Sequence, residues 1–162
     1  MMRHANLLDF LGVLADMDLT MRGQDELAQA RRLIDESLTL DQIAALLFRQ
    51  SVSTYAFTAA QAPGRALAVG GFIPERSGVL RTWMLATDEA WENYGMTLTT
   101  ECAGILKEAI KKAHRIEVVC LNSRERTHRW YNRIGLQKEA TLARYCTDGS
   151  DAALFVLTRG TL

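Results

Sequence analysis

Few side chains in this sequence could transfer a proton, and they are scattered along it. Glu75, Asp88 and Glu117 stand near predicted strands, and Tyr131 follows a tryptophan near the end of a predicted helix. Carboxylates serve as general bases, and a phenol, with an ordinary pKa near 10, can donate a proton to a leaving group. Each carboxylate also fits a turn, a helix cap or a solvated position, and an aromatic pair commonly serves packing. No convincing general base emerges.

The histidines and cysteines show no metal-binding pattern. His128 is expected on the exposed side of its helix, and His4 and His114 have no ligand partners nearby in sequence. The three cysteines are widely spaced, without a CxxC or mixed Cys/His motif. We expect no metal site, and reduced, mostly buried thiols in a reducing cytoplasm, at Cys102, Cys120 and Cys146.

Composition indicates one ordinary soluble domain. With 162 residues, 48% hydrophobic and 23% charged, the chain can bury a single core. Its 19 basic and 19 acidic residues cancel, so nucleic acid is an unlikely partner. The early apolar run at residues 7–17 contains Asp9 and Asp16 and is shorter than the roughly 20 residues of a membrane span. No membrane association is expected.

The first 50 residues read as mostly helical. Leucines at helical spacing predict a helix over residues 5–15, and the alternating segment 17–21 predicts a first strand. A second helix follows Gly23-Gln24-Asp25, and Thr39 with Gln42 forms a capping box that opens a third. We therefore divide the chain into an N-terminal helical extension, residues 1–16, and a single domain, residues 17–162.

The middle of the chain predicts a three-stranded antiparallel meander. Residues 52–57 alternate with period two, and a second run follows the Pro63-Gly64 turn. A hairpin turn at residues 75–78 then leads into a third strand, residues 79–87.

The C-terminal half alternates helices and strands. A helix is expected to start near Thr97, followed by a strand at 116–121 and a helix through Trp130. Two final strands, within 136–147 and 151–159, flank a turn at residues 147–150. The fold class is mixed α/β (α+β).

This order of elements resembles the GNAT superfamily of N-acetyltransferases, over about residues 17–160. The resemblance implies a mixed, mostly antiparallel central sheet flanked by helices, here with an extra N-terminal helix. It also implies a V-shaped opening between the fourth and fifth strands that admits acetyl-CoA, whose pantetheine pairs with the fourth strand like an added strand. Met84, Leu85 and Ala86 would offer the backbone groups.

The phosphate-binding loop of the superfamily is degenerate in this sequence. Members usually carry Gln/Arg-x-x-Gly-x-Gly/Ala there, which lets backbone amides close around pyrophosphate. In the matching stretch, residues 87–101, Gly95 is the only glycine, and Glu89 and Glu92 add negative charge. We expect Trp91 to fill part of the vacated site, together with Tyr94. By position, the cofactor-binding candidates from this stretch are Tyr94, Gly95, Met96 and Thr97.

A second superfamily marker, Asn-x-x-Ala-x-x-x-Tyr-x-x-x-Gly-Phe, is partly kept. Aligning it on Tyr131 and Gly135 puts Arg124 at the asparagine and Thr127 at the alanine. The tyrosine of this motif often protonates the departing CoA thiolate. By this resemblance, Tyr131 is the catalytic candidate.

A narrower resemblance is to short GNAT-like proteins of tailed bacteriophages. It rests on six positions in two segments, which are Trp83, Thr87, Asp88, Arg129, Trp130 and Gly135. Some of those proteins are internal virion or head-associated components. The resemblance implies a GNAT scaffold reused for assembly or ejection, in the host cytoplasm or in a virion.

Two functions from different classes follow, and a nucleic-acid or small-ligand binding module is a third. The degenerate loop favours a virion-associated structural protein without cofactor, which would bind other virion proteins or self-associate through its N-terminal helix. The alternative is an active acetyltransferase that uses acetyl-CoA and Tyr131.

Overall fold

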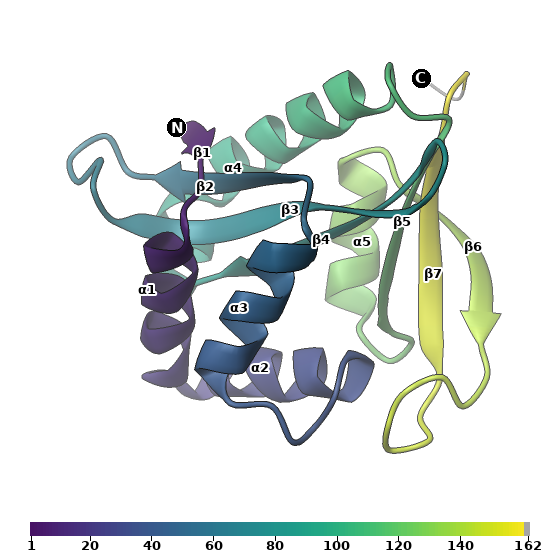
Figure 1. The fold of residues 1–162 in the computed structure, drawn as a ribbon, viewed down its shortest axis with the longest axis horizontal. Coiled ribbons are helices and arrows are strands. Elements are labelled where there is room, and N and C mark those ends of the chain that lie inside the picture. Colours follow the sequence, from purple (N-terminus) through teal and green to yellow (C-terminus); the bar gives the residue numbers. More distant parts are fainter. Residues whose placement is uncertain (161–162) are drawn as a thin grey trace.

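The computed structural model describes residues 1–160 and contains a seven-stranded sheet with helices on both faces (Figure 1). The strand order is β1-β2-β3-β4-β5-β7-β6, and β4–β5 is the one parallel pair in this sheet. The expected mixed, mostly antiparallel sheet is confirmed. The elements are β1 (Met2–His4), α1 (Leu7–Asp18), α2 (Met21–Leu33), α3 (Leu40–Gln50), β2 (Ser53–Thr58), β3 (Ala66–Arg76), β4 (Val79–Ala86), α4 (Asp88–Ala109), β5 (Arg115–Leu121), α5 (Glu125–Arg133), β6 (Gln137–Leu142) and β7 (Ala152–Thr158).

Alternating residues of the meander build two separate cores. Ala56, Val69 and Leu85 pack with α1, α2 and α3 on one face of the sheet. Their neighbours Phe57 and Ala86 pack with α4 on the other face. A further core joins α4 and α5 to β5 and β7. Because successive strand residues point to opposite faces, the period-two pattern of residues 53–86 directs helices to both sides.

The predicted first strand at residues 17–21 is wrong, because this segment is a junction between two helices. Met17 is fully buried and continues the stripe of Phe10, Val13 and Leu14 on α1. Thr20 then caps α2, accepting a hydrogen bond from the Gly23 amide at 3.0 Å. Five residues that alternate by chance cannot be distinguished from a helix end by periodicity.

The first strand lies instead at residues 2–4, where β1 pairs antiparallel with β2. Residues 1–16 thus supply an edge strand and most of a core helix, and the boundary expected at residue 16 coincides with no break in packing. Residues 161 and 162, which end the expected domain, lie outside the described part. On α1 only Leu7 and Leu8 are large exposed apolar residues, and self-association through this helix stays a prediction.

Helix α4 begins at Asp88, nine residues before the start expected near Thr97. Thr87 caps it by accepting a hydrogen bond from the Ala90 amide at 3.2 Å. The stretch with Gly95 therefore belongs to a 22-residue helix and not to a loop. A glycine weakens a helix by about 1 kcal/mol without stopping it, and the rest of the segment can continue it.

Helix α2 begins at Met21, before the start expected after Gly23-Gln24-Asp25. Several other expected elements agree with the structure. The Thr39–Gln42 capping box opens α3, and β2, β3 and β4 form the meander. β5, α5 and the closing pair β6–β7 follow in the expected order. Within residues 1–160 no helix is both long enough and apolar enough to cross a membrane.

The close approach of α1 and α2 predicts a strict requirement for glycine at position 23. A Cβ atom there would lie 2.0 Å from the Met17 carbonyl oxygen, so Gly23→Ala must push the two helices apart. We expect a loss of about 1–3 kcal/mol in the free energy of unfolding, measured by chemical denaturation. Gly104→Ala in α4 is the matched control, because a Cβ atom there meets nothing within 4 Å, and should stabilise by about 0.5–1 kcal/mol. Equal effects at both positions would refute the close-contact argument.

Candidate functional site

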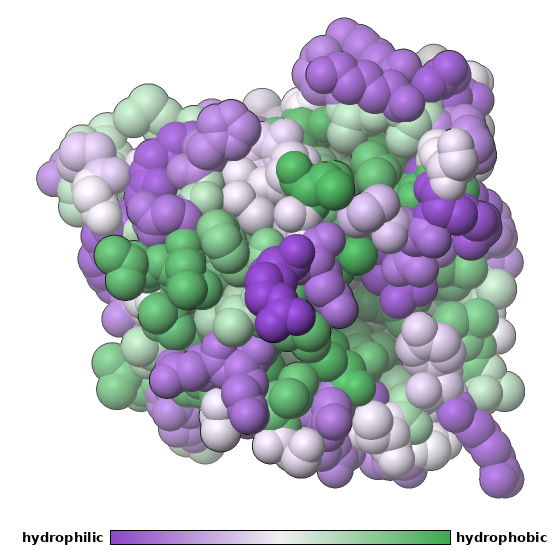
Figure 2. Space-filling model, in the orientation of Figure 1, coloured by the Kyte–Doolittle hydropathy of each residue, from purple (hydrophilic) through white to green (hydrophobic). Residues whose placement is uncertain are grey.

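The sheet opens between β4 and β5. These strands pair only where Val79–Arg81 meets Arg115–Glu117, and then diverge. A cavity of about 1270 Å³ occupies the opening, bounded by α2, β4, β5, α4 and α5. The face seen in Figure 2 is hollowed near its centre, with hydrophobic atoms inside and hydrophilic atoms around the rim. This cavity is the candidate site.

The free edge of β4 faces this opening. The Thr87 amide donates to the Leu67 carbonyl at 2.9 Å, and Ala68 lies opposite Ala86. In an antiparallel ladder, alternate residues bond to the neighbouring strand, so Leu85 bonds to β3 while Met84 and Ala86 point their backbone groups the other way. Of the three β4 candidates, two therefore offer N–H and C=O groups to a ligand in the opening.

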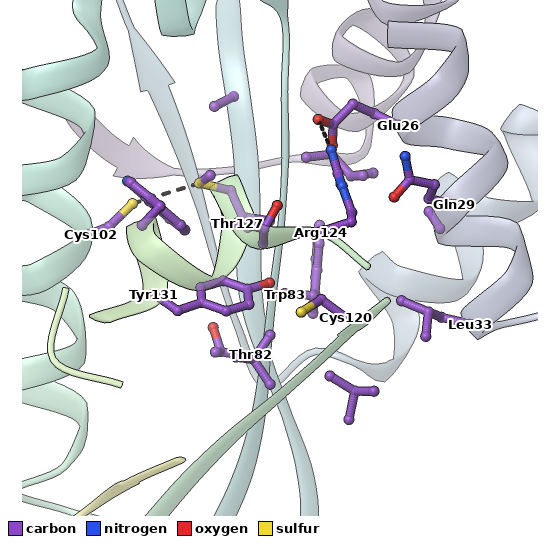
Figure 3. Close-up of a pocket in the computed structure, with 18 of the residues that line it drawn as sticks. Glu26, Gln29, Leu33, Thr82, Trp83, Cys102, Cys120, Arg124, Thr127 and Tyr131 are labelled. Carbon is purple, nitrogen blue, oxygen red and sulfur yellow. Dashed lines mark hydrogen bonds and ion pairs between the residues drawn. The ribbon is translucent and has the colours of Figure 1, made fainter. Parts of the chain in front are cut away.

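Tyr131 projects from α5 into the cavity (Figure 3). Its ring packs against Phe155 and Trp130, with centroids 5.2 and 5.7 Å away. Its hydroxyl makes no hydrogen bond to any residue of the described chain. Burial, with a smaller contribution from Cys120, raises the pKa of Tyr131 far above its usual value. The phenol thus keeps its proton at neutral pH, and its hydroxyl is left without a partner among residues 1–160.

Arg124 occupies the position of the motif asparagine and reaches across the cavity to α2. Its guanidinium donates two hydrogen bonds to Glu26, at 2.5 and 3.0 Å, and both side chains are about three-quarters buried (Figure 3). The positive charge of Arg124 partly offsets the rise in the pKa of Tyr131. Glu26 was not a candidate from the sequence. Nothing in the pattern of its helix indicates a contact with Arg124, which lies about 100 residues later in the chain.

The three carboxylates considered as general bases lie outside the cavity lining. Glu75 pairs with Arg81 at 3.0 Å. Glu117 is buried and accepts a hydrogen bond from Arg115 at 2.6 Å. Asp88 begins α4, 3.8 Å from Arg22. Each has a structural role, so none is supported as a base.

His128 is not on an exposed helix face as expected. Its Nε2 lies 3.3 Å from the Leu121 carbonyl, and its ring packs on Phe155 with centroids 5.0 Å apart. His128 therefore helps to fix α5 onto β5 and β7.

The start of α4 provides little for a phosphate. Thr87 leads directly from β4 into the helix, and its side chain satisfies the Ala90 amide. The first-turn amides left without a protein acceptor belong to Asp88 and Glu89, whose side chains are acidic. Arg65 bridges Glu89 to Asp16 at 2.8 and 2.9 Å, so this neighbouring cation is already paired.

The four loop candidates, residues 94–97, are corrected by this geometry. Tyr94, Gly95, Met96 and Thr97 lie about two turns inside α4, where backbone amides bond to carbonyls four residues earlier. They cannot wrap around a diphosphate, because no loop separates β4 from α4.

The aromatic residues of α4 also differ from expectation in part. Trp91 lines the cavity and meets Trp130 edge-on, with ring centroids 5.3 Å apart. Tyr94 turns away, packing near Phe57 and donating a hydrogen bond to Gln61 at 3.2 Å. Trp91 thus reaches the site while the cavity stays open.

All three cysteines are free, as expected. Cys102 and Cys120 line the cavity, and burial raises the pKa of both thiols to about 12. They remain protonated at neutral pH and are poor nucleophiles. Over residues 1–160, no three His, Cys, Asp or Glu side chains gather as a metal site would require.

Comparison with solved structures identifies the architecture. A ribosomal-protein-alanine N-acetyltransferase from Brucella melitensis superposes with a TM-score of 0.73 at 14% identity, covering 98% of this chain and 99% of the other. A GNAT-family acetyltransferase from Bacillus anthracis gives 0.70 at 12% identity, with 97% and 93% covered. The aminoglycoside acetyltransferase AAC(6')-Ib, in complex with coenzyme A and kanamycin, gives 0.69 at 16% identity, with 99% and 95% covered.

No protein-family model and no curated protein matches the sequence. At these identities the structural matches establish the fold alone. The chain has the GNAT fold over nearly its whole length.

The raised pKa of Tyr131 predicts a change in stability at alkaline pH. Because the folded pKa lies above the unfolded value near 10, the folded protein holds this proton more tightly, and stability falls as pH rises above about 10. Tyr131→Phe removes this contribution, so its free energy of unfolding should decline less than that of wild type between pH 9 and 11. Urea denaturation at each pH measures it. Tyr145→Phe, at an exposed tyrosine, is the control, and an identical decline in wild type and Tyr131→Phe would contradict the assignment.

Proposed function

We propose that this protein transfers an acyl group from a pantetheine thioester, such as acetyl-CoA, to an amine. The observation that carries the proposal is an open cavity in which the unpaired hydroxyl of Tyr131 stands near the free edge of β4. A GNAT fold without catalytic activity could fill this cavity with side chains, because core packing alone maintains a fold. The open cavity therefore favours a protein that binds a ligand there.

Each part of the cavity has a role in this proposal. The backbone groups of Met84 and Ala86 receive an extended pantetheine as a strand receives a neighbour. A bound thioester supplies the acyl group, whose transfer forms a C–N bond to the amine and breaks the C–S bond. Tyr131 donates its proton to the departing sulfur, and the proton that the amine nitrogen loses returns to the phenolate, so the products are an amide and a thiol.

The acceptor is expected to enter from the side of α2. Glu26 and Gln29 line this side, and the Glu26–Arg124 pair narrows it. We propose an amine as the acceptor because the solved structures similar to this chain include an N-acetyltransferase. The acceptor's own identity is not specified by these residues.

The virion-associated role is the competing proposal. It is supported by the acidic first turn of α4, which lacks a backbone site for pyrophosphate. It gives no reason for the free hydroxyl of Tyr131 inside an open cavity. Binding measurements separate the two functions.

Calorimetric titration with acetyl-CoA and with S-acetyl-pantetheine tests donor binding directly. Catalysis requires saturable binding of at least one donor and release of a thiol in the presence of primary amines. Absence of heat with both donors at millimolar concentration would refute the proposal and favour the non-catalytic role.

Replacement of the proton donor should slow the reaction without weakening binding. For Tyr131→Phe we expect kcat to fall by about 10²–10⁴-fold, because general acid catalysis contributes in that range. The Kd for acetyl-CoA should stay within about twofold of wild type, and Tyr145→Phe should leave both values unchanged. Unaltered turnover in Tyr131→Phe would remove Tyr131 from the mechanism.

A further inference from the structure

Helix α5 carries a stripe of arginines beside the cavity. Arg126, Arg129 and Arg133 all line the opening. Their spacing of three and four residues places them along one side of the nine-residue helix. In a chain with zero formal net charge, this stripe is a local concentration of positive charge.

These arginines form few ion pairs or hydrogen bonds with the rest of the described chain. Neither Arg126 nor Arg133 forms an ion pair or a side-chain hydrogen bond with any residue from 1 to 160. Arg129 has only Glu125, at 3.7 Å in a well-exposed pair, which contributes little. By contrast, Arg22, Arg32 and Arg124, which line the same cavity, are each paired with a carboxylate. The stripe is therefore free to meet an external anion.

The stripe flanks Trp130, which packs against α4. Trp130 stands between Arg126 and Arg133 along α5 and contacts Trp91, the fourth residue of α4. In the first turn of α4 the exposed amides belong to acidic residues, so backbone binding of a phosphate is weak there. Guanidinium groups can instead bind phosphate oxygens in a bidentate manner.

We infer that the Arg126, Arg129 and Arg133 side chains bind the phosphate groups of a coenzyme A donor, in place of a backbone loop. This inference rests on the proposed function, because it assigns the charged end of the donor whose thioester end lies near Tyr131. Binding by exposed side chains makes affinity for coenzyme A depend on salt, whereas the uncharged pantetheine portion binds without that dependence.

The test compares coenzyme A with pantetheine, which lacks the phosphates. Arg126→Gln and Arg133→Gln should each weaken coenzyme A binding about tenfold, equivalent to about 1.4 kcal/mol, and the double variant more. Pantetheine affinity should not change, and raising the salt from 0.05 to 0.5 M should reduce the difference between wild type and variant. Arg49→Gln on α3 is the matched control, an exposed arginine outside the cavity lining.

Different binding results would refute the arginine site and the proposed acyl transfer. If the double variant binds coenzyme A as tightly as wild type, the arginine site is excluded, while acyl transfer through Tyr131 can still stand. If wild type binds neither coenzyme A nor pantetheine, both proposals fall. Thermal unfolding of each variant confirms that the exposed substitutions leave the fold intact.

Discussion

The separation of β4 from β5 after three paired residues is the constraint on which this structure depends. Two strands that part leave backbone donors and acceptors without partners, and these groups must be satisfied by solvent or by a bound chain. α2 and α5 stand on either side of the gap and are tied together by Glu26 and Arg124. The Tyr131 side chain lies in the cavity at this gap.

The start of α4 sets the second constraint, which acts on charge. Helix α4 begins directly at the end of β4, so no loop is present that could enclose an anion. The acidic side chains of its first turn already interact with the positive end of the helix dipole. The cations near this turn, Arg22 and Arg65, are committed to carboxylates. Positive charge remains available on α5, on the arginines that we propose as a phosphate site.

Local patterns predicted the elements that local physics controls. The Thr39 capping box, the β2–β4 meander and the β5–α5 unit that carries Tyr131 are built from residues that follow one another closely along the chain. The strand expected at residues 17–21 failed because Met17 belongs to a helical stripe that only packing reveals. The late start assigned to α4 failed because one glycine and several polar residues resemble a loop, although Thr87 caps a continuous helix through them.

The amino-acid sequence by itself determined the order of most elements, the absence of a glycine-rich turn after β4 and the position of Tyr131 in its motif, since these are properties of spacing along the chain. Only the tertiary structure decided that β1 lies at residues 2–4, that Tyr94 turns away while Trp91 lines the cavity, and that Glu26 meets Arg124. Those features depend on contacts between distant segments, whose geometry is set when the helices pack against the sheet and not by any local preference.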